Sequence, residues 1–281
     1  MYDRLSLAFR SCLTGVGLCV LLSLAGALMP RAAWAAGGNM SQSAAGHDLT
    51  TQSDDSDLRR RARIRLELAA AYYGQGQYTT ALDELKQVMT LDSSMSDAFE
   101  LRGLIYDALN EPTLVEESFR RALELDARNG SVLHNYGWYL CRKQQYDRAD
   151  ALFARAAELP NSVLTSKTML ARGVCQIQAG SLANAEKSLL RAYELEPGNP
   201  ATAYNLALVL YRKGELERAR FHIRRINNVS ERANAESLWL GIRIEHKLGN
   251  VNVRDELASQ LRSRFSDTRE GVQLELGHYD E

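Results

Sequence analysis

Residues of similar kind recur every 34 positions along most of this 281-residue chain. Tyr72 is followed by Tyr106 at this spacing, and Asp92 by Asp126. A repeat of this length is typical of two antiparallel helices with their turns, and one such pair cannot bury its apolar side alone. The pairs are therefore expected to stack, which leaves a long surface suited to holding another molecule rather than to transforming it.

Small residues recur at one phase of this repeat: Gly103, Gly137, Gly173, Ala207 and Gly241. Glycine inside a helix costs about 1 kcal/mol relative to alanine. Its recurrence predicts that helices cross there too closely for a side chain to fit. Together with the period, this predicts an all-α tetratricopeptide-repeat (TPR) solenoid, a right-handed superhelix of about six helix-turn-helix repeats.

The predicted TPR domain spans 58–267, with repeats at about 62–95, 96–129, 130–163, 166–199, 200–233 and 234–267. The fourth repeat arrives two residues late, and we expect the additional residues, near 161–165, to lie in a loop between repeats. The sixth is irregular, as expected of a terminal cap, because Gly249 comes one residue late. A polar C-terminal tail, 268–281, is expected to fray.

The N-terminus has the pattern of an export signal. Basic residues precede an uncharged apolar stretch, Leu13–Met29, and Ala33-Trp34-Ala35 fits signal peptidase. We predict a signal peptide at 1–35 and a disordered linker at 36–57, because the linker has almost nothing apolar to bury. An uncleaved membrane anchor is the alternative, although 17 residues is short for a span. No cysteine has a convincing lipid-attachment context, so membrane association stays open.

The composition argues against several function classes. A formal net charge of -1 does not favour a nucleic-acid partner. No catalytic constellation, cofactor motif or metal-ligand spacing is present, so we expect neither an enzyme nor a bound cofactor. The arginines at 59, 60, 61, 63 and 65 could form a membrane or partner patch, but a solvated helix face is favoured because apolar spacing runs through them.

Helix positions that should line the stack predict a protein-binding groove. Its members are Tyr73, Glu100, His134, Asn135, Trp138, Arg142, Tyr204, Asn205, Tyr211 and Arg212. The amides can donate to and accept from a peptide backbone. The aromatic rings offer contact area and the arginines can hold carboxylates. The alternative is that Asn135 serves a local role and that Trp138 belongs to the core; Trp239 is expected to be packed.

Cys141 and Cys175 fall on the first helices of neighbouring repeats. A bridge requires Cα atoms within about 7 Å, which this placement allows. An exported protein would also favour a disulfide. The alternative is a pair of buried thiols that act as small apolar residues.

Three stretches carry a family resemblance: Ala62–Ala69, His134–Cys141 and Glu236–Glu245. Over roughly 60–267, the chain resembles the PilW or PilF type IV pilus biogenesis and stability proteins, which are exported TPR proteins of Gram-negative bacteria. The resemblance implies a non-enzymatic periplasmic adaptor, possible association with the outer membrane, and help in multimerisation or localisation of the pilus secretin. Many members are lipoproteins, a pattern missing here. A general periplasmic TPR scaffold in envelope assembly is the alternative.

Overall fold

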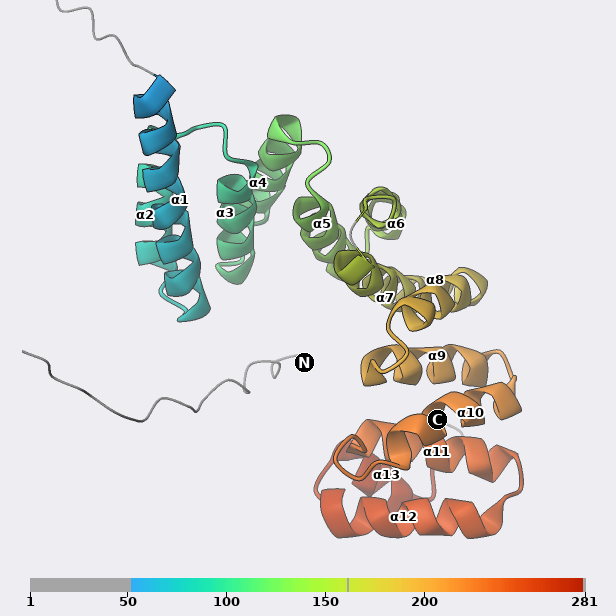
Figure 1. Cartoon of the computed structure of the whole chain (residues 1–281). Helices are drawn as coiled ribbons and strands as arrows, with labels where there is room; N and C mark the ends of the chain where they lie inside the picture. The colour runs from blue at the N-terminus through green and yellow to red at the C-terminus, as the bar shows by residue number, and fades with distance from the viewer. Residues whose placement is uncertain (1–51, 161, 280–281) are drawn as a thin grey trace, which may run out of the picture. The chain divides into compact units, whose positions relative to one another are not determined.

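The computed structural model describes residues 52–160 and 162–279, and within these ranges it contains thirteen α-helices and no strand. The predicted signal peptide (1–35) and the predicted linker up to residue 51 lie outside the described residues. The first twelve helices form antiparallel pairs, one pair per repeat, as Figure 1 shows. The expectation of an all-α stack of helix pairs is confirmed.

We call the first helix of each pair the A helix and the second the B helix. The A helices are α1 (Gln52–Gly74), α3 (Ser96–Ala108), α5 (Gly130–Arg142), α7 (Ser162–Gln178), α9 (Pro200–Arg212) and α11 (Ala235–Lys247). The B helices are α2 (Tyr78–Leu91), α4 (Pro112–Leu125), α6 (Tyr146–Ala157), α8 (Leu182–Leu195), α10 (Leu216–Asn227) and α12 (Val251–Phe265). Each A helix packs on its own B helix and on the next A helix, whereas the B helices α4 and α6, and α8 and α10, are joined by the side-chain ion pairs Arg148–Glu116 and Arg218–Glu186. The A helices therefore form the continuous side of the stack.

The small residues lie where an A helix crosses its B helix. A methyl group added to Gly103 would approach the Phe119 ring to 3.2 Å, and one added to Gly137 would approach the Phe153 ring to 3.0 Å. At Gly173 the added carbon would sit 2.5 Å from Leu189. The predicted close approach of helices at these three positions is confirmed, because each glycine faces a large buried side chain sixteen residues further on.

The sixth repeat has a different register from the predicted one. The bounds of α11 place Ile242, not Gly241, at the position that Gly137 occupies in α5. Ile242 is fully buried and shares a core cluster with Ala258, so the large residue is now on the A helix and the small one on the B helix. Gly241 is also tightly packed, but against Asn227 and Leu257. The late Gly249 thus reflects a one-residue shift of the whole repeat.

Turns between the paired helices require a residue in the left-handed region. Gly76, Gly180 and Gly214 have φ values of 75° to 78° there, as expected for turn glycines. Asn110 and Gln144 fill the same place in repeats 2 and 3 with φ of 58° and 60°. Side chains that rarely adopt this conformation are therefore tolerated in two of the turns.

Three predicted boundaries differ from the structure. Helix α1 begins at Gln52, six residues before the predicted domain start. The residues added before repeat 4 extend α7 to 17 residues instead of forming a loop. The predicted frayed tail contains α13 (Arg269–Leu276), which Leu274 anchors in a core cluster at 2% exposure.

Candidate protein-binding face

Three positions recur at the same distance from the start of three A helices; the first two are half-buried in each helix, and the third is buried in α5 and α9. These are His134, Trp138 and Cys141 in α5, Tyr204, Leu208 and Tyr211 in α9, and Trp239, Arg243 and His246 in α11. Their spacing of four and then three residues places them on one side of a helix. We call the surface formed by these positions and their neighbours the A face. The burial pattern of residues 131–140 is repeated in residues 201–210, so repeats 3 and 5 present equivalent surfaces.

A buried carboxylate joins repeats 2 and 3 on the A face. Glu100 is 8% exposed, and its Oε1 accepts hydrogen bonds from the Asn135 amide at 2.6 Å and from the Ser131 hydroxyl. Burial raises the pKa of Glu100 above its usual range, although the two hydrogen bonds oppose this rise. The Asn135 amide is therefore engaged with a residue of the neighbouring repeat, which differs from the local role that the alternative interpretation expected.

His134 and Trp138 lie one turn apart on α5 and are both half-buried. His134 Nδ1 shares a hydrogen bond of 3.0 Å with the hydroxyl of Thr168 on α7. Burial lowers the pKa of His134, and the nearby charge of Lys167 lowers it further, so the ring is neutral near pH 7. Trp138 packs against the core cluster of repeats 2 to 4 with part of its ring still exposed. It is thus both a core residue and a surface aromatic.

Tyr73 and Arg142 meet at Asp107, a residue that the sequence analysis did not select. Arg142 is ion-paired to Asp107 across the boundary between repeats 2 and 3. Burial raises the pKa of the Tyr73 hydroxyl, and Asp107 raises it further while Arg142 lowers it. The A face of the first three repeats therefore holds one exposed charge pair beside a half-buried aromatic ring.

Repeat 5 differs from the predicted groove in one position. Tyr211 was expected to face the groove but is only 8% exposed, and its hydroxyl has no hydrogen-bond partner among the described residues. The side chains of Arg243 and Lys247 cover its ring, at 5.0 and 4.9 Å from the centroid. Tyr204 and Asn205 are half-buried and Arg212 is exposed, so these three do lie at the surface. The Asn205 amide donates to the Ala201 carbonyl at 2.8 Å.

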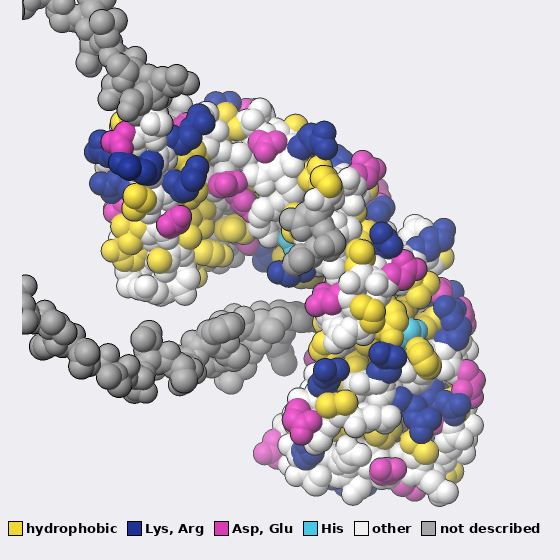
Figure 2. Space-filling view, viewed as in Figure 1, with side chains coloured by type: hydrophobic (Ala, Val, Ile, Leu, Met, Phe, Trp, Pro, Cys, Tyr) yellow, Lys and Arg dark blue, Asp and Glu magenta, His cyan; other side chains and the backbone are white. Residues whose placement is uncertain are grey.

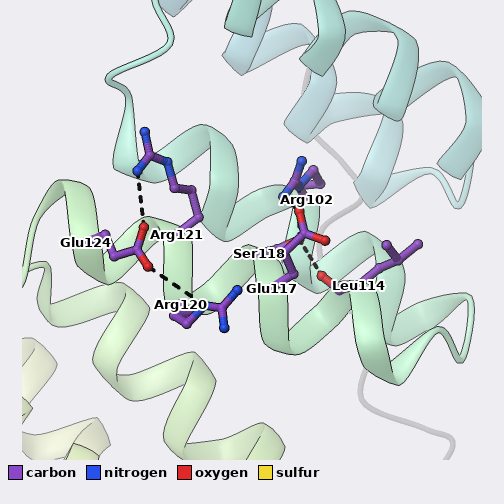
Figure 3. A network of polar contacts seen from close by, with 7 residues as sticks. All are labelled: Arg102, Leu114, Glu117, Ser118, Arg120, Arg121 and Glu124. Carbon is purple, nitrogen blue, oxygen red and sulfur yellow. Dashed lines mark hydrogen bonds and ion pairs between the residues drawn. The ribbon is translucent and has the colours of Figure 1, made fainter.

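Other charged side chains form hydrogen bonds and ion pairs within their own repeat. Figure 3 shows a polar network in repeat 2 made of Arg102, Leu114, Glu117, Ser118, Arg120, Arg121 and Glu124. Arg102 donates to the Ser118 hydroxyl at 2.9 Å and pairs with Glu117 at 3.1 Å, which ties α3 to α4. Such partly exposed pairs hold helices in register at a modest energy, so we assign them a structural role.

The arginines of α1 lie between residues 59 and 65, in the middle turns of the helix, and Lys and Arg side chains gather at this end of the molecule in Figure 2. Arg59 pairs with Asp92 at 3.2 Å, and Arg65 pairs with Glu84 at 2.6 Å. Both arginines bind the following B helix, which is the behaviour of a solvated helix face. The favoured interpretation of this run agrees with these contacts.

The cysteines of repeats 3 and 4 are joined in the structure. Cys141 of α5 and Cys175 of α7 form a disulfide with their Cα atoms 5.8 Å apart, and both are buried. We propose that this bridge forms in solution.

The described residues hold no group of three or more possible metal ligands. Within the same residues, no helix is long and apolar enough to cross a membrane. What the A face offers is instead half-buried aromatic rings beside exposed charges, a composition typical of protein–protein interfaces.

Two family models, both described as tetratricopeptide repeat, match the chain. One covers 66–132 and 135–200, the other covers 176–237, and together they span more than half of the sequence. The chain is a tetratricopeptide repeat protein. The match agrees with the 34-residue period and with the helix pairs of the structure.

Among relatives of this TPR protein is the type IV pilus assembly protein PilF of Pseudomonas aeruginosa. It is 28% identical over 205 residues, which cover 73% of this chain and 81% of that protein. A solved structure of P. aeruginosa PilF superposes with a TM-score of 0.68 at 24% identity, covering 79% of this chain and 99% of that one. The crystal structure of PilW, described as a widely conserved type IV pilus biogenesis factor, gives 0.68 at 27% identity, covering 76% and 97%. The TPR protein is homologous to PilF and similar in structure to both.

Proposed function

We propose that this TPR protein is a non-enzymatic adaptor in type IV pilus biogenesis. The observation that carries the proposal is homology to PilF over 73% of the chain, together with a matching stack of repeats. TPR solenoids act by presenting an extended surface to other polypeptides. The partner of this protein is accordingly another protein of the pilus machinery.

The finer proposal is that the protein works in the periplasm and assists multimerisation or localisation of the outer-membrane secretin. Support comes from the export signal predicted at 1–35 and from the family resemblance of the A-helix segments. The A face would hold the partner through Trp138 and Tyr204, with Arg142 and Arg212 beside them. Aromatic and arginine side chains supply most of the binding energy in many interfaces.

A deletion strain tests the pilus assignment. We expect loss of surface pili and of twitching motility, and a reduced fraction of secretin in its multimeric form. Expression of the wild-type chain should restore all three. Normal piliation, twitching and secretin multimers in the deletion strain would refute the assignment.

Complementation with variants tests the A face. Trp138→Ala should fail to restore piliation while it accumulates to the wild-type level. Phe221→Ala is the matched control, because Phe221 is 57% exposed on the B helix α10 and is not on the A face. Full function of the Trp138→Ala chain, or an equal loss of function with Phe221→Ala, would show that the partner does not bind at Trp138 on the A face.

A general scaffold in envelope assembly is the second candidate. It predicts a different phenotype of the deletion strain, namely altered cell shape or sensitivity to detergent with pili intact. The two candidates are therefore separated by one strain.

A further inference from the structure

The end of the described chain folds back onto the A face of the last repeat. The ring of Tyr279 stacks on His246 with centroids 4.5 Å apart and on Trp239 at 5.9 Å. Arg243 Nε donates a hydrogen bond of 2.9 Å to the Tyr279 carbonyl oxygen. The guanidinium of Arg254 lies 6.0 Å from the same ring. The A face of α11 thus binds Tyr279 in two ways: aromatic side chains stack on its ring, and an arginine donates a hydrogen bond to its backbone carbonyl.

The residues beneath Tyr279 are the recurring positions of the A face. Trp239, Arg243 and His246 in α11 correspond to His134, Trp138 and Cys141 in α5. In the proposed function these positions hold the partner. Tyr279 therefore occupies, in repeat 6, the place where a segment of another chain would lie in the earlier repeats.

Tyr279 packs against the same core cluster as Leu274 of α13, but Tyr279 is half-buried whereas Leu274 is part of the cluster itself. Leu274 holds this helix in the core of repeat 6 at 2% exposure. The helix ends at Leu276, and the left-handed conformation of Gly277, with φ of 71°, turns the chain back toward α11; Gly277 and His278 are exposed. Gly277 and His278 stay hydrogen-bonded to the end of α13, and Tyr279 can leave the A face without removing any buried side chain of that helix.

We propose that the A face of α11 is a binding site for an extended peptide segment with an aromatic side chain, and that Tyr279 fills this site until a partner displaces it. The ring of the partner would stack on Trp239 and His246, and its backbone carbonyl would accept from Arg243. Occupation by the chain's own tail lowers the apparent affinity, because the intrinsic affinity is multiplied by the fraction of molecules in which the site is open. The inference concerns the A face and holds whether or not the partner belongs to the pilus.

The test uses a labelled peptide with the chain's own last seven residues, 275–281, as the probe. Its binding is measured by fluorescence anisotropy to the full chain, to a chain that ends at Leu276, and to full-length Tyr279→Ala. We expect the shortened chain and Tyr279→Ala to bind at least tenfold more tightly than the full chain. A peptide with alanine in place of its tyrosine should not bind.

Two further variants locate the site. His246→Ala in the shortened chain should abolish binding. Val272→Ala in the full chain is the control, since Val272 is 51% exposed on α13, and it should leave the full chain closed. Circular dichroism checks that the shortened chain keeps its helices; if it does not, full-length Tyr279→Ala decides alone.

Three binding results and one sedimentation result would overturn the proposal. The first is equal binding by the full chain and Tyr279→Ala, the second is binding that His246→Ala does not change, and the third is no binding to either opened form. A full chain that sediments as a dimer, while Tyr279→Ala is a monomer, would also overturn it, because the occupant would then be the tail of a second copy.

Discussion

Within a repeat, the side-chain volumes of two buried residues compensate for each other. One residue lies on the A helix and the other lies sixteen residues later on the B helix. Gly173 faces Leu189, Ala207 is buried with Ile223, and Ile242 is buried with Ala258. A small residue on one helix thus accompanies a large one on the other. Because protein interiors are close-packed, the summed side-chain volume of the pair is constrained more strongly than the volume of either residue.

The tightest pair gives the first prediction. We expect Gly173→Ala to lower the free energy of unfolding by about 1–3 kcal/mol, because overpacking outweighs the gain in helix propensity. Gly74→Ala is the control, since a carbon added there meets nothing within 4 Å, and it should be neutral or slightly stabilising. Urea denaturation measures both. Equal stability of the two variants would show that Leu189 yields without cost.

This pairing explains what the sequence could and could not predict at the residue scale. The glycines at 103, 137 and 173 were identified correctly because each recurs in phase and faces a large residue. Gly241 led to a wrong register for repeat 6. It lies 34 residues after Ala207, but the pair of buried side chains that corresponds to the earlier repeats is one residue further on. The Ile242–Ala258 pair, which fixes the register of repeat 6, has its sizes reversed and so carries no glycine signal.

His222 gives a prediction on pH. It is 7% exposed, its Nδ1 has no hydrogen-bond partner among the described residues, and Tyr193 and Phe221 lie edge-on to its ring. Burial, together with the charges of Arg218 and Arg225, lowers its pKa to about 4. The unfolded state, with a pKa near 6.5, therefore binds the proton first. Stability should fall as pH drops from about 6.5 to about 4, by up to about 3 kcal/mol from this group.

The measurement is urea denaturation of the wild type and of His222→Gln at several values between pH 7.5 and 4. Glutamine does not titrate, so the variant should lose less stability over this range than the wild type. Parallel curves for the two proteins would contradict a buried neutral His222.

At the scale of elements, α13 acts as part of the sixth repeat. Its prediction uses two leucines two residues apart on one helix. Leu274 is 2% exposed and Leu276 is 58% exposed. We expect Leu274→Ala to cost about 2–5 kcal/mol in the unfolding of the last repeat. Leu276→Ala should change stability by less than about 0.5 kcal/mol. Hydrogen exchange in α11 to α13 reports the difference, and equal protection in both variants would contradict a packed α13.

The sequence analysis missed α13 for a physical reason. Its eight residues are mostly polar, and a short polar segment at a terminus is expected to fray. One signal was present, because Leu206, Leu240 and Leu274 are each 34 apart and continue the repeat past its predicted end. The position of Tyr279 carried no such signal, since it depends on Gly277 turning the chain back onto α11.

At the scale of the whole molecule, the sequence predicted which helices share a face but not how all of their side chains are packed; that this face is a binding groove stays a prediction. The A-helix spacing identified the face, and Trp138, Tyr204 and Arg142 lie on it. It could not show that Tyr211 is covered or that Glu100 and Asn135 bond to each other. These contacts join neighbouring repeats, and their partners depend on how one pair of helices is seated on the next.

The link between Cys141 and Cys175 gives the last prediction, because it joins repeats 3 and 4 where α7 carries its additional residues. In a repeat array each unit contacts only its neighbours, so the weakest interface decides whether the stack unfolds as one body. A bridge that closes a loop of 34 residues stabilises by about 4 kcal/mol in the chain-entropy model. Reduction should therefore lower the melting temperature of the wild type and leave that of Cys175→Ala unchanged. A wild type that reacts fully with a thiol reagent when unfolded without reductant would show that the cysteines are free, and the interface between the two repeats would then depend on packing alone.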